Sequence, residues 1–318
     1  MGIISFTKKI LFGVYKQVFK NKISVKELEK ENETLKYQLE YMKRHFDIRQ
    51  MKPAIGWLRE FQLKEIEFAK EIISLFKGID FFLESGGLIG AIRHGGFIPY
   101  DDDIDLDVVR KDFRTIIDYS QKHFVWIDTT DIYENFMEFQ NNAIKNNPNK
   151  IVAILTPFCL HLYKGTSLRD SLNVEIFPYD YIKEDVLKED FAKYVQNSIS
   201  AISKMKSWKE IFDYYDLELS SDKIFSDEKT SKIVPGLGHG TFFHQKFVDF
   251  QSAKDIFPIK YVKFENTTLP VPAEPEKVIE KIYPNWRSFP SDVGISKDLK
   301  VLNDYLITIG ECIPWMGC

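Results

Sequence analysis

The chain has 318 residues and a formal net charge of −4, and 44% of its residues are apolar, enough for a sizeable buried core. This mild acidity gives no reason to expect a nucleic-acid partner, because phosphate backbones attract basic surfaces. Three scattered cysteines, Cys159, Cys312 and Cys318, are too few for a disulfide framework or a cysteine zinc site and are typical of a reducing compartment.

The first predicted element is a basic amphipathic helix over residues 1–22. Apolar residues recur along one stripe at helical spacing: Phe6, Ile10, Leu11, Val14, Tyr15, Val18 and Phe19. Lysines fill the opposite face: Lys8, Lys9, Lys16, Lys20 and Lys22. This pattern is typical of a helix on an anionic membrane surface. A helix packed on the body of the protein or on a second subunit is the alternative, and the stripe leaves both open.

The next segment, residues 25–46, is a short heptad run. Its seam residues alternate three and four positions apart: Val25, Leu28, Asn32, Leu35, Leu39, Met42 and Phe46. This spacing predicts a coiled coil in which Asn32 sets register or oligomeric state. The alternative is an amphipathic helix that docks on the core. We expect self-association through this segment and assign residues 1–52 to an N-terminal appendage.

From about residue 53 the pattern is mixed α/β, and residues 53–318 form the predicted catalytic domain. A helix is expected at 56–77 and further helices at 183–215. Short β-like runs are expected at 80–84, 104–109, 151–155, 158–163 and 172–177. Prolines recur among short apolar runs in the last third and predict that loops dominate there, among them Pro235, Pro258, Pro270, Pro272, Pro275, Pro284 and Pro290.

The segment Phe81–Val109 carries the most informative pattern. A β-like run ends at Ser85, and Gly86 and Gly87 follow it. Two adjacent glycines let the backbone approach a ligand closely. A helix that begins at Leu88 would point its free N–H groups at an anion. The glycine pair therefore predicts a phosphate contact, although most glycine pairs after strands are simple turns.

Acidic and aliphatic residues alternate strictly over 103–108. On a strand, this period places three carboxylates on one face: Asp103, Asp105 and Asp107. Neighbouring carboxylates repel each other unless a cation compensates them. Since Mg²⁺ is held by carboxylates and substrate phosphates, we expect phosphoryl chemistry with Asp103 and Asp105 as ligands of Mg²⁺ or Mn²⁺. A solvated acidic face is the alternative, and a calcium loop is excluded because Leu106 stands where it requires glycine.

A third carboxylate is predicted on a neighbouring strand. In the segment Leu172–Phe177, Asn173 and Glu175 share one face, and aliphatic residues occupy the other. Glu175 can act as a metal ligand, as the base that takes the proton of an acceptor hydroxyl, or as both. A solvent-facing residue on an edge strand is the alternative.

These two acidic blocks resemble the LicD/fukutin family, which are phosphotransferases of the nucleotidyltransferase superfamily. The first block is GGLIGAIRHGGFIPYDDDID at 86–105. It departs from the usual family motif by Ile89, which replaces leucine, and by Tyr100, which replaces tryptophan. The second block, VEIFPYD at 174–180, has Glu175 where the family carries aspartate. Glutamate is longer than aspartate by one methylene group, and this length shifts the metal geometry that Glu175 would offer as a third ligand.

A weaker third block around Phe264 and Glu265 extends the resemblance to about residues 60–290. The resemblance implies a nucleotidyltransferase-type core, an α/β fold with a mixed β-sheet flanked by helices and preceded here by the N-terminal helix. It also implies transfer of a phospho-alcohol group, of the phosphocholine, ribitol phosphate or glycerol phosphate type. The donor would be CDP-linked, and the acceptor would be a hydroxyl of a cell-surface glycan.

Residue roles follow from the same resemblance. The implied catalytic and metal-binding set is Asp103, Asp105 and Glu175. The implied substrate-binding set is Gly86, Gly87, Arg93, His94 and Asp101. Arg93 would stabilise the CMP leaving group, because guanidinium pairs with phosphate in a bidentate manner. His94 would do the same or hold the loop.

Two other functions are the alternatives, and the first of them uses the same carboxylates. A true nucleotidyltransferase would leave the nucleoside monophosphate on a small acceptor, and a non-catalytic assembly protein would use the heptad segment as its interaction module. His239 and His244 lie in a glycine-bearing loop and are expected to be structural. We expect a bacterial cytoplasmic location, with the acceptor lipid-linked at the inner face of the membrane, because no apolar stretch reaches the roughly 18 residues of a spanning helix.

Overall fold

The computed structural model describes residues 27–129, 135–221, 223–238, 249–288 and 297–310. The chain divides into two compact units. The smaller unit comprises Met1–Gln50 and Arg287–Ser291, and the larger comprises Met51–Trp286 and Asp292–Cys318. The domain boundary predicted after residue 52 lies close to this division.

In the smaller unit the described residues form a helix over 27–45 and the 3-10 helix η1 (Ile48–Gln50). Leu28, Leu35 and Met42 of the heptad seam have exposed side chains on the helix. A helix is thus confirmed over these residues, while the coiled-coil partner stays a prediction. The predicted basic helix at 1–22 lies outside the described residues.

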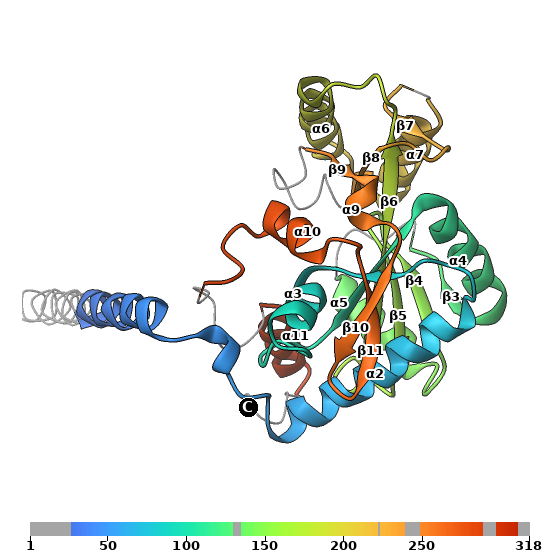
Figure 1. Cartoon of the computed structure of the whole chain (residues 1–318). Coiled ribbons are helices and arrows are strands. Elements are labelled where there is room, and N and C mark those ends of the chain that lie inside the picture. The colour runs from blue at the N-terminus through green and yellow to red at the C-terminus, as the bar shows by residue number, and fades with distance from the viewer. Residues whose placement is uncertain (1–26, 130–134, 222, 239–248, 289–296, 311–318) are drawn as a thin grey trace, which may run out of the picture. The chain divides into compact units, whose positions relative to one another are not determined.

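Among the described residues of the larger unit, nine strands form one mixed sheet. Its main order is β1-β2-β6-β5-β4-β3, while β7 and β8 pair with β6 and β9 pairs with β8 (Figure 1). The strands are β1 (Phe82–Leu83), β2 (Ile104–Val109), β3 (Val125–Ile127), β4 (Val152–Leu155), β5 (Leu160–Lys164), β6 (Leu172–Ile182), β7 (Phe225–Ser226), β8 (Lys232–Pro235) and β9 (Gln251–Ser252). β2 runs parallel to β6, and β5 runs antiparallel to it. Strands β10 (Lys260–Phe264) and β11 (Thr267–Val271) form a separate antiparallel hairpin.

Helices flank this sheet, and α6 and α7 lie together at one end of β6 (Figure 1). The helices are α2 (Gly56–Leu75), α3 (Ser85–Arg93), α4 (Arg110–His123), α5 (Phe136–Lys145), α6 (Lys188–Ile202), α7 (Trp208–Ser220), α9 (Ala253–Ile256), α10 (Pro275–Ile282) and α11 (Lys297–Thr308). The predicted α/β fold with a mixed sheet and flanking helices is confirmed. Within the described part of the chain, none of the helices has the length and apolar character required to cross a bilayer.

The alternation in β2 positions the acidic residues. Ile104, Leu106 and Val108 are fully buried at 0% exposure and belong to the main core of the larger unit. Val174 and Ile176 of β6 are equally buried beside them. Because successive strand residues point to opposite faces, the apolar sides of both strands fix the acidic side chains on the other face.

Several local expectations were wrong. Asp103 precedes β2 and does not lie on it, because the strand begins at Ile104. The helix expected from Leu88 begins at Ser85, so both glycines lie in its first turn. The last third was expected to be mostly loop, yet its described residues include the β10–β11 hairpin and helices α10 and α11. Proline there is compatible with regular structure, since Pro275 occupies the first turn of α10, where its missing N–H costs nothing.

Candidate functional site

A row of polar residues crosses three strands at one level of the sheet. In the parallel pair of β2 and β6, Asp105 lies opposite Glu175. In the antiparallel pair of β6 and β5, Glu175 lies opposite His161. Residues opposite each other on neighbouring strands point to the same face. The backbone register therefore brings together two of the three predicted catalytic carboxylates.

The segment that enters β2 adds more acidic side chains. Carboxylate oxygens of Asp101, Asp102 and Asp103 lie within 4.8 Å of one another. Burial raises the pKa of Asp103 well above its ordinary value, and the charges of Asp105 and other nearby carboxylates raise it further. Such a concentration of like charge is stable only with protons or a cation.

Helix α3 places its first turn against this acidic segment. A β-carbon on Gly86 would meet the carboxylate of Asp101, so a larger residue here would displace that side chain. A β-carbon on Gly87 would come within 3.3 Å of Leu83. The first N–H groups of a helix have no partner within the helix and favour anions. Gly86, Gly87 and Asp101 of the predicted substrate set thus lie at one place.

Arg93 and His94, at the other end of α3, contact each other. The Nε atom of Arg93 donates to Nε2 of His94 at 3.0 Å, and Nη1 donates to the backbone oxygen of Trp286 at 2.5 Å. Burial and the adjacent guanidinium lower the pKa of His94 to about 4, so the imidazole is neutral at neutral pH. A neutral acceptor at Nε2 orients the guanidinium, which favours the loop-holding role for His94 over direct phosphate binding.

Helix α2 supports the same region from outside the acidic blocks. Gln62 donates from Nε2 to the backbone oxygen of Asp101 at 2.8 Å. One turn later, the Oε1 atom of Glu65 accepts from the backbone N–H of Asn173 at 2.8 Å. Burial raises the pKa of Glu65 well above its ordinary value. The helix thereby fixes both the aspartate segment and the start of β6.

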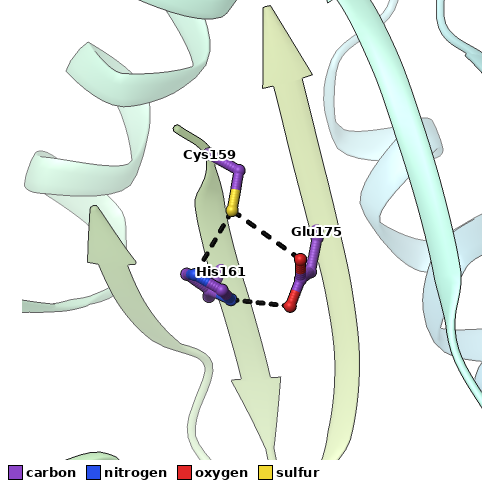
Figure 2. A group of neighbouring side chains, drawn as sticks. All are labelled: Cys159, His161 and Glu175. Carbon is purple, nitrogen blue, oxygen red and sulfur yellow. Dashed lines mark hydrogen bonds and ion pairs between the residues drawn. The ribbon is translucent and has the colours of Figure 1, made fainter. Parts of the chain in front are cut away.

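The carboxylate of Glu175 lies beside His161 and Cys159 (Figure 2). Its Oε1 atom lies 2.8 Å from Nδ1 of His161 and accepts from Asn173 at 3.1 Å, and Oε2 lies 3.7 Å from Sγ of Cys159. Burial alone would raise the pKa of Glu175, but His161 and the hydrogen bond from Asn173 outweigh it and lower the pKa. Glu175 is therefore held in its charged form.

A second acidic pair lies beside this site. Glu84, directly before α3, and Asp107 of β2 are almost fully buried. Burial raises the pKa of Glu84 to about 8 against the opposing effect of a hydrogen bond with Asp107. Burial and the charge of Glu84 raise the pKa of Asp107 well above its ordinary value. At neutral pH the pair holds protons that ordinary carboxyl groups would release.

Sequence reasoning did not assign His161, Cys159, Gln62, Glu65 or Glu84 to the site. A signal existed for the first two, because the predicted strand at 158–163 alternates polar and apolar residues. The two residues of α2 had no such signal, since their contacts depend on how the helix packs. His239 and His244 lie outside the described residues, as do Cys312 and Cys318. The predicted roles of all the site residues stay predictions.

Comparison with known proteins identifies one family. Residues 78–206 match the model of the LicD/FKTN/FKRP nucleotidyltransferase domain. This match contains both acidic blocks, α3 and the β2–β6 pair. The resemblance identified from the sequence is therefore confirmed over this part of the chain.

Three curated proteins are similar to parts of the chain. The lipopolysaccharide cholinephosphotransferase LicD of Haemophilus influenzae is 38% identical over 132 residues, covering 40% of this chain and 46% of that protein. An uncharacterised protein of Rickettsia typhi is 29% identical over 112 residues, covering 34% of this chain and 31% of that protein. A Rickettsia prowazekii protein is 50% identical over 34 residues, 11% of this chain and 13% of that protein. The chain thus spans less than half the length of each relative.

Proposed function

We propose that the LicD-family domain at residues 78–206 transfers a phospho-alcohol group from a CDP-linked donor to a hydroxyl of a cell-surface glycan. The alignment of Asp105 with Glu175 across β2 and β6, beside the acidic segment 101–103, carries this proposal. Similarity to a lipopolysaccharide cholinephosphotransferase supports the reaction class. Phosphocholine, ribitol phosphate and glycerol phosphate all fit this class of donor.

A divalent cation, Mg²⁺ or Mn²⁺, fits the acidic segment. The ligand set consists of oxygens only, which such hard cations prefer. The raised pKa of Asp103 indicates uncompensated negative charge where the cation would bind. Asp103 and Asp105 would hold it, with Glu175 as the third predicted ligand. When bound, the cation neutralises charge on the diphosphate of the donor.

The other predicted residues act on the donor and acceptor. The N–H groups at Gly86 and Gly87 receive a phosphate oxygen of the donor. The guanidinium of Arg93, oriented by His94 and Trp286, stabilises the CMP leaving group. These contacts put the phosphorus atom that carries the alcohol within reach of the acceptor.

Glu175 completes the exchange of atoms. The acceptor oxygen forms a bond to the phosphorus that carries the alcohol, and the bond from that phosphorus to the bridging oxygen breaks. CMP leaves with the bridging oxygen, and the hydroxyl proton passes to the carboxylate of Glu175. A carboxylate whose pKa is lowered is present in its charged form at neutral pH and can accept this proton.

The cellular setting is part of the proposal. We place the reaction at the cytoplasmic face of a bacterial membrane, on a lipid-linked glycan acceptor. The exposed heptad residues on the helix over 27–45 support self-association of the chain at this surface. The basic segment at 1–22 would add attraction to anionic lipids.

A nucleotidyltransferase is the second candidate, because the same carboxylates would serve it. The products distinguish the two reactions: the phospho-alcohol is found on the glycan in the first, and a nucleoside monophosphate is found on the acceptor in the second. A non-catalytic assembly protein would give neither product. The retention of the acidic segment, Asp105 and Glu175 in one place favours an enzyme.

Calorimetric titration with CDP-choline, CDP-ribitol, CDP-glycerol and ATP, with and without Mg²⁺, tests the proposal. One CDP-linked donor should bind in a Mg²⁺-dependent manner, and mass analysis of a glycan acceptor should show the added phospho-alcohol. Asp103→Asn and Asp105→Asn should abolish transfer and leave the fold intact, whereas Asp185→Asn, at an exposed position, should change nothing. Near wild-type turnover of Asp105→Asn at saturating Mg²⁺ would show that the metal assignment is wrong.

A further inference from the structure

Three side chains with different ligand atoms meet beside the acidic segment (Figure 2). Sγ of Cys159 lies 3.2 Å from Nε2 of His161 and 3.7 Å from Oε2 of Glu175, and Nδ1 of His161 lies 2.8 Å from Oε1 of Glu175. One ligand atom from each residue falls within 4.8 Å of the others. Sulfur, nitrogen and oxygen thus converge, in contrast to the oxygen-only set of Asp101, Asp102 and Asp103.

The backbone fixes this arrangement. His161 of β5 lies opposite Glu175 of β6 in an antiparallel register. Cys159 stands two residues before His161 and therefore points to the same face of the sheet. All three positions belong to paired strands or adjoin them, so the backbone holds their side chains on one face of the sheet.

Surrounding residues hold the three side chains in place. The hydroxyl of Tyr163 lies 3.3 Å from Nδ1 of His161 and accepts from Gln140 at 2.6 Å. Thr156 accepts the backbone N–H of Cys159 at 3.2 Å, and its hydroxyl lies 3.6 Å from Sγ. Hydrogen bonds of this kind orient ligands around a metal.

The three side chains differ in their exposure to solvent. Cys159 and His161 are 0% and 4% exposed, whereas the side chain of Glu175 is 21% exposed, so solvent reaches the group from the side of the carboxylate. Three protein ligands and one side open to solvent are typical of a zinc site that keeps a fourth position for water. A tetrahedral zinc ion separates its ligand atoms by roughly 3.3–3.6 Å, judging by the usual bond lengths. The distances of 3.2 Å and 2.8 Å involve different ring nitrogens of His161, whereas one ligand atom from each residue lies within 4.8 Å of the others, so the side chains would draw together around the ion.

We propose that Cys159, His161 and Glu175 form a binding site for a thiophilic divalent cation of the Zn²⁺ class. On binding, Cys159 loses its proton to solvent and binds as the thiolate, and His161 exchanges a hydrogen bond for a bond to the ion. The spacing of the cysteines excluded a zinc site built from cysteines, and this site uses only one of them. Glu175 belongs to this site and to the predicted Mg²⁺ site, so Zn²⁺ withdraws one carboxylate from the latter.

Titration with Co²⁺ tests the site, because a thiolate bound to Co²⁺ gives a charge-transfer absorption that oxygen ligands do not give. The experiment uses the full chain with Cys312→Ser and Cys318→Ser, so that Cys159 is the remaining cysteine. We expect the absorption to increase until one equivalent of Co²⁺ has been added and then to stay constant. Added Zn²⁺ should abolish it by displacing Co²⁺. Excess Mg²⁺ should not abolish it, since Mg²⁺ binds thiolate poorly.

Matched variants separate this site from the Mg²⁺ site. Cys159→Ser should remove the absorption, and His161→Ala should weaken Co²⁺ binding by more than the roughly tenfold loss typical of changes around a metal. Asp103→Asn should retain the absorption, because it removes only an oxygen ligand of the other site. The absorption reports coordination by cysteine and does not depend on phospho-alcohol transfer. The proposed cation site and the proposed function can therefore fail independently of each other.

Two results would overturn the proposal. One is the lack of a thiolate absorption at saturating Co²⁺ in the chain with Cys159 intact. The other is unchanged Co²⁺ affinity in His161→Ala, with circular dichroism confirming that the variant is folded. In both cases the three side chains would serve only to position Glu175 through hydrogen bonds.

Discussion

Each carboxylate near β2 has surroundings that set its charge. Burial raises the pKa of Asp103 and of Asp107, and like charges around them add to the effect. Glu175 is partly buried, but His161 and Asn173 lower its pKa. The site therefore combines a carboxylate whose charged form is favoured with carboxylates that gain protons unless a cation binds. Opposite shifts within one site are typical of catalytic centres.

Glu175→Gln should lower turnover more than it weakens donor binding. The substitution keeps the length of the side chain but removes the group proposed to accept the proton in the transition state. Steady-state kinetics at saturating donor would measure this, with Glu184→Gln at an exposed position as the control. If turnover is unchanged and only the melting temperature falls, Glu175 has a structural role and does not act as the base.

The pair of Glu84 and Asp107 should make the metal-free protein less stable as pH rises. The pKa of Glu84 is about 8 in the folded chain, above its ordinary value of 4.5, so the folded state retains a proton that the unfolded state releases. This contribution is fully present below about pH 4.5 and is lost as pH rises through 8. In Glu84→Gln the loss of unfolding free energy between low and high pH should be smaller by about 1 kcal/mol or more, since each pKa unit corresponds to about 1.4 kcal/mol. Urea unfolding in EDTA between pH 5 and 9 measures this, and an equal slope in the variant would contradict it.

Helix α2 organises the site from one face. Arg59, Gln62 and Glu65 are spaced three residues apart, which places them along one side of the helix. They reach three separate segments: Arg59 contacts Glu265 of the β10–β11 turn, Gln62 contacts Asp101, and Glu65 contacts the start of β6. A single helix thus connects parts of the chain that are far apart in sequence.

Glu265 links that helix to the loop after α3. Its Oε1 atom accepts from Arg59 at 2.8 Å and from the backbone N–H of Phe97 at 3.1 Å, and its own N–H donates to Gly95 at 2.7 Å. A β-carbon on Gly96 would meet the carboxylate of Glu265, so a larger residue there would displace this side chain from its partners. The loop that leads from His94 to the acidic segment is held by this residue.

Glu265→Ala should destabilise the fold by about 1–3 kcal/mol, because it leaves buried hydrogen-bond donors without their partner. Asp213→Ala removes an exposed ion pair with Lys209 and should cost less than about 1 kcal/mol. Denaturant unfolding of the two variants measures the difference. Equal losses would show that the contact between Glu265, Arg59 and the loop contributes no more than a surface ion pair.

At the scale of the whole molecule, the chain divides into a larger unit that carries the candidate site and a smaller unit. All the predicted site residues lie in the larger unit, Met51–Trp286 with Asp292–Cys318. The smaller unit contains the heptad segment and the lysine-flanked stripe. The catalytic and the associative properties are therefore expected to be separable.

Deleting residues 1–50 should leave transfer to a small glycan acceptor unchanged. The deletion should reduce the oligomer mass and weaken binding to anionic vesicles, because the heptads and the lysines are removed. Vesicle binding of the full chain should fall with added salt, which screens exposed charges beyond about 8–10 Å. Light scattering and vesicle co-sedimentation measure both effects. If the truncated chain keeps the oligomer mass and vesicle affinity of the full chain, the appendage serves only as packing. If the truncated chain cannot fold, the heptad helix belongs to the core.

The sequence by itself determined the fold class, the resemblance to the LicD family over residues 78–206 and the acidic blocks. Strict alternation over 103–108 was sufficient to place Asp105 on a buried strand, because side-chain direction in a strand follows from position alone. The glycine pair was correctly associated with the start of α3, although the helix begins three residues earlier than expected. Helix ends are poorly fixed by local pattern, since glycine is tolerated in the first turn.

Only the tertiary structure decided what surrounds these residues. His161 contacts Glu175 because β5 pairs with β6 in one register, and a shift by one residue would turn it to the other face. Glu65 reaches a residue 108 positions away, and Arg59 one that is 206 positions away. Contacts over such separations depend on how strands and helices pack, and no local period encodes them. The charge of Glu175, the protonated pair of Glu84 and Asp107, and the meeting of Cys159 with His161 all follow from that packing.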